Sequence, residues 1–196
     1  FALVKKYPSL FRFFIPFTMY SAGISVIVKF FGIYASEELK ITGTFLIITG
    51  AILQLSSMLS AVSFGFMQDK VGAKLTLQTS LLWWLLGLLG IYYLENISLF
   101  FTMEIKQMFI VIAFIAGSAL GATQSASRAV VGLITKKEDA SLSYGLWGVF
   151  GKLAIVLGMI FGPISDAVGR HNALIVIMFY FLIGFLLLRL VPFDTL

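Results

Sequence analysis

The chain has 196 residues, of which 60% are hydrophobic and only 12% are charged, and its mean hydropathy is +1.02. A soluble domain carries about 25% charged residues, so this composition excludes an ordinary soluble protein and indicates a membrane protein. The net charge is +5, but the cations form no stripe that would bind nucleic acid, and the absence of Cys excludes disulfides and thiolate metal sites.

Residues 1–12 contain three cations and a proline, and they are predicted to form a short basic segment at a membrane surface. Residues 13–196 are predicted to form one all-α domain of six transmembrane helices. Each apolar run is near or above the ~20 residues that cross ~30 Å of hydrocarbon. The expected spans cover residues 13–35, 42–66, 75–94, 107–134, 142–164 and 172–191.

The Lys and Arg residues at the ends of these spans are distributed unequally between the two sides of the membrane. Nine lie on the side of the amino terminus and three on the other, while Lys29 and Lys152 fall within spans. The positive-inside rule then predicts that both termini are cytoplasmic. The expected location is a bacterial plasma membrane. Because the chain begins with Phe1 rather than Met, we expect it to be a piece of a longer protein.

One loop pattern occurs twice, after the second span and after the fifth. Residues 65–74 and residues 162–170 both place an Asp four residues after a Gly, a second Gly three residues later, and a cation beyond. The two loops are expected on opposite sides of the membrane, which predicts an inverted repeat of three plus three helices, as in secondary transporters. Coincidence is the alternative, since Gly-rich turns commonly join helices. Spans three and six are apolar nearly all round, which favours contact with lipid.

Polar residues inside the spans are the candidates for substrate or cavity contacts, because such groups usually face protein or water. Alternatives are open for the cations: a snorkelling side chain for Lys29, a headgroup anchor for Arg128, and a buried, partnered lysine for Lys152. No Asp or Glu lies in the middle of a span, so the matching ligand would carry an anionic group such as a carboxylate. The candidates are Lys29, Gln124, Arg128 and Lys152.

The fourth span also carries Gly117, Gly121 and Ser125 at every fourth residue, a face that lets another helix approach closely. The sequence contains no Ser/His/Asp set, no His spacing for a metal and no phosphate-binding loop with its lysine. We therefore expect no enzyme activity, no cofactor and no metal.

The loop at residues 65–74 resembles the signature loop of the major facilitator superfamily, Gly-x-x-x-Asp-(Arg/Lys)-x-Gly-x-(Arg/Lys). The matching residues are Gly65, Asp69, Lys70, Gly72 and Lys74. The resemblance implies one six-helix half of a twelve-helix transporter that works by alternating access, with this loop as a gating and structural element. Asp69 is expected to cap the following helix and to meet its positive end.

More specifically, the chain resembles the carboxy-terminal half of the autophagy-related, vacuole-effluxer-like branch of that superfamily. The stretches that carry this resemblance are residues 33–39, 121–128, 144–146 and 150–158. Ala22 and Thr135 depart from the pattern, which has an acidic residue and a proline there. The branch is associated with export of amino acids or related small solutes.

Two functional hypotheses follow. The first is half of a secondary transporter for a small polar solute such as an amino acid or another carboxylate, with a cavity wall from spans one, two, four and five. Its partners would be the lipid bilayer and an amino-terminal six-helix half, or a second copy through the same face. The alternative is a non-transporting membrane sensor, scaffold or assembly module, whose fifth span would have no water-accessible face. A membrane hydrolase is disfavoured for want of a nucleophile and base.

Overall fold

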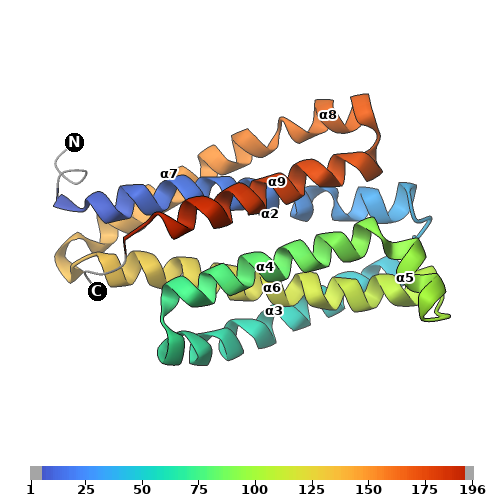
Figure 1. Cartoon of the computed structure of the whole chain (residues 1–196), viewed down its shortest axis with the longest axis horizontal. Helices are drawn as coiled ribbons and strands as arrows, with labels where there is room; N and C mark the ends of the chain where they lie inside the picture. Colours follow the sequence, from blue (N-terminus) through green and yellow to red (C-terminus); the bar gives the residue numbers. More distant parts are fainter. Residues whose placement is uncertain (1–5, 193–196) are drawn as a thin grey trace.

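A computed structural model describes residues 6–192, and every regular element in this part of the chain is a helix (Figure 1). Six segments are long and apolar enough to cross a membrane, which confirms the six predicted spans. Residues 1–5 of the predicted basic segment lie outside the described residues. The helices are α2 (Pro8–Glu37), α3 (Thr44–Val71), α4 (Ala73–Tyr92), α5 (Leu94–Phe100), α6 (Ile105–Ile134), η1 (Lys137–Asp139), α7 (Ala140–Gly158), α8 (Phe161–Val168) and α9 (Arg170–Arg189).

The first spanning helix begins at Pro8, five residues before the predicted start, so residues 8–12 are helical. Proline is tolerated in the first turn because its missing N–H would have no partner inside the helix. Leu10 and Phe13 are both fully buried, and this packing extends the helix past the charged Arg12. Charge at Arg12 therefore does not mark the end of the apolar segment.

The fifth span is broken, whereas a continuous helix was expected over residues 142–164. The chain leaves α7 at Gly158 and enters α8 at Phe161. Pro163 has no N–H to donate to the carbonyl of Met159, and Gly162 bonds that carbonyl instead at 3.2 Å. At the same point Gly158 packs against the backbone and side chains of α2, where it leaves no room for a Cβ.

The helix bounds show the inverted repeat directly. Helix α6 begins and ends 97 residues after α2, and α9 begins and ends 97 residues after α4. The packing repeats as well: α3 lies on α6 as α7 lies on α2, and α4 lies on α6 as α9 lies on α2. In Figure 1, α2 runs from left to right and α6 from right to left, so the two repeats have opposite directions. The 3+3 arrangement is therefore confirmed.

The two related loops share a glycine with the same unusual backbone conformation. Gly72 has φ +86° between α3 and α4, and Gly169 has φ +85° between α8 and α9. Residues with a side chain rarely adopt such angles, so each sharp reversal between helices depends on glycine. The sequence pattern shared by residues 65–74 and 162–170 thus encodes the same turn twice.

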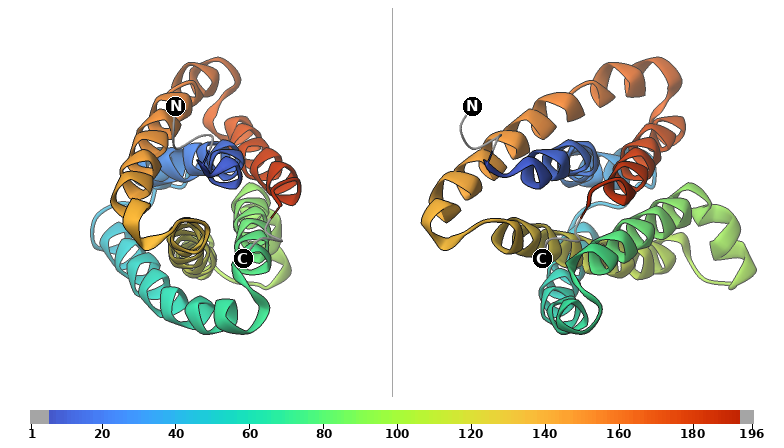
Figure 2. Two further views of the ribbon diagram at one scale, coloured as in Figure 1. Left: turned by 90° about the vertical axis from the view of Figure 1, so that its left-hand side faces the viewer. Right: turned by 60° about the vertical axis from the view of Figure 1, so that its left-hand side comes forward.

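The helices form a bundle with α2 and α6 in the middle, α3 and α7 on one side, and α4 and α9 on the other (Figure 2). The core includes Trp84 of α4 stacked on Phe181 of α9, with ring centroids 5.1 Å apart. Only 17% of the residues are buried in the most apolar stretches of α3 and of the fifth span, against 39% in α4. Spans two and five are thus the most exposed of the six within this chain, whereas α4 and α9 pack on each other. The expected contact of spans three and six with lipid stays a prediction.

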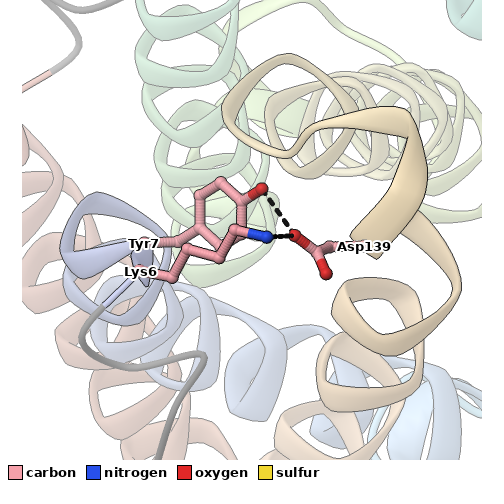
Figure 3. Close-up of polar contacts among 3 residues, drawn as sticks. All are labelled: Lys6, Tyr7 and Asp139. Carbon is pink, nitrogen blue, oxygen red and sulfur yellow. Dashed lines mark hydrogen bonds and ion pairs between the residues drawn. The ribbon is translucent and has the colours of Figure 1, made fainter.

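The amino end of α2 is tied to the loop between α6 and α7. Lys6 and Tyr7 both donate to the same carboxylate oxygen of Asp139, the Tyr7 hydroxyl at 2.7 Å (Figure 3). The hydrogen bond from Lys6, followed by that from Tyr7, lowers the pKa of the Asp139 carboxyl below its ordinary value. Because the pKa of Asp139 is lowered in the folded protein, this contact stabilises the fold at pH values above the ordinary pKa of aspartate. The stabilisation is lost as the pH falls through the lowered pKa of the folded state.

We expect this contact to open below about pH 4, near and under the ordinary pKa of aspartate, and to open at neutral pH in Asp139→Asn. Spin labels on Ser9→Cys and Lys137→Cys in the full-length protein would report it as a broader distance distribution by electron paramagnetic resonance. Glu138→Gln is the matched control, since the hydrogen bonds from Lys6 and Tyr7 go to the neighbouring Asp139. An unchanged distribution in Asp139→Asn would contradict the prediction.

Candidate substrate site

A hollow of about 560 Å³ opens between α3, α6 and the start of α7. Gln124 and Arg128 line it, and both project from the same face of α6 because they lie one turn apart. The other polar residues of its lining are Gln54, Ser57, Ser125 and Tyr144. The structure therefore brings together two of the four candidates predicted from the sequence.

Close contact between α3 and α6 builds one wall of this hollow. A Cβ at Gly117 would overlap the backbone of Leu53, and a Cβ at Gly121 would overlap the carbonyl of Ser57. Ser56 of α3 also donates to the carbonyl of Phe114 at 2.5 Å. The predicted close approach at Gly117 and Gly121 is confirmed, and it places the polar side chains of α3 beside those of α6.

Two aromatic residues of α7 contact Arg128 at the edge of the hollow, Trp147 its side chain and Tyr144 its backbone. Its guanidinium carbon lies 5.6 Å from the ring centroid of Trp147, and the Tyr144 hydroxyl donates to the Arg128 carbonyl at 3.2 Å. Stacking on an aromatic face suits a guanidinium and leaves its edge N–H groups free to donate. Within residues 6–192 no carboxylate pairs with Arg128, so these donors remain for a ligand.

The charge of the lining determines which ligands fit it. Arg128 is the single cation among the lining residues, and none of them is Asp or Glu. A planar guanidinium recognises a carboxylate through two parallel hydrogen bonds. The amide and hydroxyl groups of Gln54, Gln124 and Ser57 can donate to or accept from neutral polar groups. The arrangement therefore suits a small polar solute with an anionic end.

The other two candidates do not line this hollow. Lys152 lies on the exposed side of α7, whereas Ala154 and Gly158 of that helix are buried against its neighbours. Lys29 is exposed near the far end of α2, and Ser25, one turn earlier, donates to the Ala22 carbonyl at 2.8 Å. Both stay predictions as substrate contacts.

Sequence reasoning missed three polar residues of the lining, namely Gln54, Ser57 and Tyr144. Gln54 and Ser57 lie three residues apart in the second span. Polar residues inside a span are energetically costly and usually face protein or water, so their polarity could have identified both as candidates. Tyr144 carried no such signal, because a tyrosine near a span end is ordinary. Its place beside Arg128 comes from the packing of α7 near the end of α6.

The residues of the predicted gating loop belong mostly to helices. Gly65, Asp69 and Lys70 lie in α3, Gly72 joins α3 to α4, and Lys74 lies in the first turn of α4. The expectation that Asp69 caps α4 is wrong: Gly72 occupies the cap position and no side chain bonds there. Asp69 instead lies in the last turn of α3, three residues before the Gly72 cap.

Lys74 connects the loop to the end of the bundle. Its ammonium group donates to the carbonyls of Arg189 and Val191, at 3.2 and 2.8 Å. These carbonyls lie at the carboxyl end of α9, where a cation is favoured by the helix dipole. Lys74 therefore ties α4 to α9 within this chain. Around it lies a separate hollow of about 570 Å³, which Asp69, Gly72 and Leu133 also line.

Comparison with known families decides the class of the protein. The sequence model of the Major Facilitator Superfamily matches residues 13–195. The chain belongs to the major facilitator superfamily. Its six crossings in a 3+3 arrangement are half of that fold, and the protein is a multi-pass integral membrane protein. The superfamily consists of transporters rather than enzymes. Among the described residues, no three His, Asp or Glu side chains gather in a way that could hold a metal ion.

One curated relative resembles nearly the whole chain. It is an uncharacterized MFS-type transporter, YxiO, of Bacillus subtilis, which is 22% identical over 194 residues. The alignment covers 98% of this chain but 43% of the relative. The chain thus spans less than half the length of the relative that it matches.

Proposed function

We propose that the chain is the carboxy-terminal half of a secondary transporter, which moves a small polar solute with a carboxylate group by alternating access. The observation that carries this proposal is the Arg128 guanidinium in a polar hollow, held by Trp147 and without an acidic partner among residues 6–192. Amino acids are one class that fits. The resemblance to the autophagy-related, vacuole-effluxer-like branch supports amino-acid efflux.

An amino-terminal six-helix half is the proposed partner of the exposed faces of α3 and α7. These faces carry large apolar side chains that this chain leaves uncovered, such as Val62 and Phe66 on α3 and Val149 and Val156 on α7, all more than 50% exposed. Large exposed apolar side chains on one helix are typical of an interaction surface or of lipid contact. The greater length of the relative supports a second half, and a second copy of this chain is the alternative occupant.

The proposed orientation places both termini in the cytoplasm of a bacterial cell. The start of α2 and the end of α9 lie at the same end of the bundle (Figure 1). Lys70, Lys74 and Lys136 belong to the helix ends and loops on that side. The excess of Lys and Arg there supports a cytoplasmic position by the positive-inside rule.

The proposal is tested by transport in vesicles that contain the full-length protein. We expect saturable uptake or efflux of one class among labelled amino acids, hydroxy acids and dicarboxylates. The matching amides, which lack the carboxylate, should be transported at least tenfold less well, because a charge-assisted hydrogen bond is lost. A protein that moves the amides as well as the acids would contradict the carboxylate assignment.

The non-transporting sensor or scaffold is the alternative, and α7 discriminates between the two. Apart from Tyr144, no residue of α7 lines the hollow in this chain, which is the observation that favours the alternative. Cysteine scanning of residues 144–162 in the full-length protein gives a labelling period of three to four residues for a cavity wall. If no position of the helix is labelled, the result would indicate a packed scaffold.

A further inference from the structure

A separate hollow of about 420 Å³ lies at the basic end of the bundle, between the start of α2 and the end of α6. Lys6, Ser9, Leu133, Thr135 and Lys136 are among its lining residues. It shares no lining residue with the substrate hollow, so the proposed transport function does not account for it.

Thr135 is the buried polar residue of this hollow. The residue is 9% exposed, and its hydroxyl oxygen finds no hydrogen-bond partner. A buried hydroxyl without a partner is unfavourable, so such groups usually meet a water or a ligand. The lone hydroxyl therefore points to a polar group from outside the chain.

The groups around Thr135 are mainly hydrogen-bond donors. Lys136 is exposed, and no ion pair involves it within the described part of the chain. The Lys6 ammonium contacts Asp139 (Figure 3), but an ammonium group has three N–H donors and can serve a second acceptor. The first turn of the 30-residue helix α2 has no side-chain cap, and its positive end favours an anion. Together these groups suit a phosphate.

Apolar surface adjoins these donors. Leu133 is 52% exposed at the edge of the hollow, and the exposed ring of Pro8 lies on the other side. A free phosphate would leave this surface in water, whereas the glycerol and acyl groups of a lipid would cover it. Basic hollows between transmembrane helices on the cytoplasmic side are known to bind anionic headgroups.

We propose that this hollow binds the phosphate of an anionic phospholipid in the leaflet at the basic end, through Lys136, Lys6 and the hydroxyl of Thr135. Lys136 supplies a charge that no ion pair engages in the described part of the chain. Thr135 completes its hydrogen bonding on the phosphate oxygens, and Leu133 lies against the glycerol and the start of an acyl chain. The lipid anchors the α6–α7 loop to the amino end of α2.

Binding is tested on the purified full-length protein by native mass spectrometry with phosphatidylglycerol, phosphatidylcholine and inorganic phosphate. We expect preferential retention of phosphatidylglycerol. Lys136→Gln should weaken it about tenfold through the loss of a charge-assisted hydrogen bond, and Thr135→Val about threefold through the loss of a neutral one. Lys137→Gln is the matched control: it removes the same charge one residue away, outside the lining, and should leave retention within about twofold.

Each contrary result overturns the proposal in a different way. Equal weakening by Lys137→Gln would indicate general surface charge. Displacement of the lipid by millimolar inorganic phosphate would indicate a free-anion site. Full retention of phosphatidylglycerol in Lys136→Gln would exclude this hollow, and that variant decides the question even if Thr135→Val fails to fold. None of these readouts depends on transport, so they stand apart from the proposed function.

Discussion

Replacement of Gly121 by alanine is expected to destabilise the protein by about 3 kcal/mol, the upper range for overpacking a tight contact. The added Cβ would overlap the carbonyl of Ser57 on α3, which is backbone and cannot rotate away. Either the two helices separate or α6 bends. Both changes deform the wall of the substrate hollow, so transport should fall with stability.

Thermal unfolding of the full-length protein in detergent, followed by size-exclusion chromatography, measures this effect. Gly148→Ala is the matched control, since a Cβ at this glycine of α7 meets nothing within 4 Å. Alanine there should be neutral or stabilising by up to about 1 kcal/mol through helix propensity. Equal stability of the Gly121 and Gly148 variants would mean that α3 and α6 are not in this close contact.

Arg128→Gln is expected to lower kcat/KM for the proposed carboxylate substrate about a hundredfold, with normal folding. Losing one partner of a desolvated charge pair costs about 3 kcal/mol, which corresponds to that factor. The side chain is exposed to the hollow and has no ion pair in the described residues, so its removal leaves no unpaired protein charge. Vesicle transport over a range of substrate concentrations measures the change.

Arg128→Lys separates charge from geometry. Lysine keeps the charge but cannot bond a carboxylate with two parallel donors or stack flat on Trp147, so we expect only partial activity. Arg12→Gln is the control, because Arg12 is exposed at the same end of the bundle and does not line the hollow. If Arg128→Gln transports as well as the control, Arg128 is a headgroup anchor and the substrate site lies elsewhere.

The fold could be predicted from the sequence to a large extent. Six spans follow from the length of apolar runs alone, because bilayer thickness sets one length for every crossing. The inverted repeat was visible in the loops because Gly72 and Gly169 adopt a backbone conformation that favours glycine. These features depend on short stretches of chain, and a single sequence records them.

The candidate site was predicted only in part. Gln124 and Arg128 lie one turn apart on one helix, so their common face follows from helical spacing. Gln54 and Tyr144 join them from two other helices, which no spacing along the chain can predict. Lys152 fell within a span as Arg128 did, yet it lies outside the hollow because of how α7 is rotated against α2.

The sequence by itself determined the membrane class, the six spans, the repeated turn and the excess of cations at one end. Hydrophobicity, glycine conformation and charge act locally, so they can be predicted without knowing which helices meet. Tertiary structure alone decided the contacts between elements: the bond from Lys74 to the end of α9, the approach of Ser57 to Gly121, and the unpartnered hydroxyl of Thr135. Each of these depends on the relative rotation and depth of two packed helices, which local properties leave undetermined.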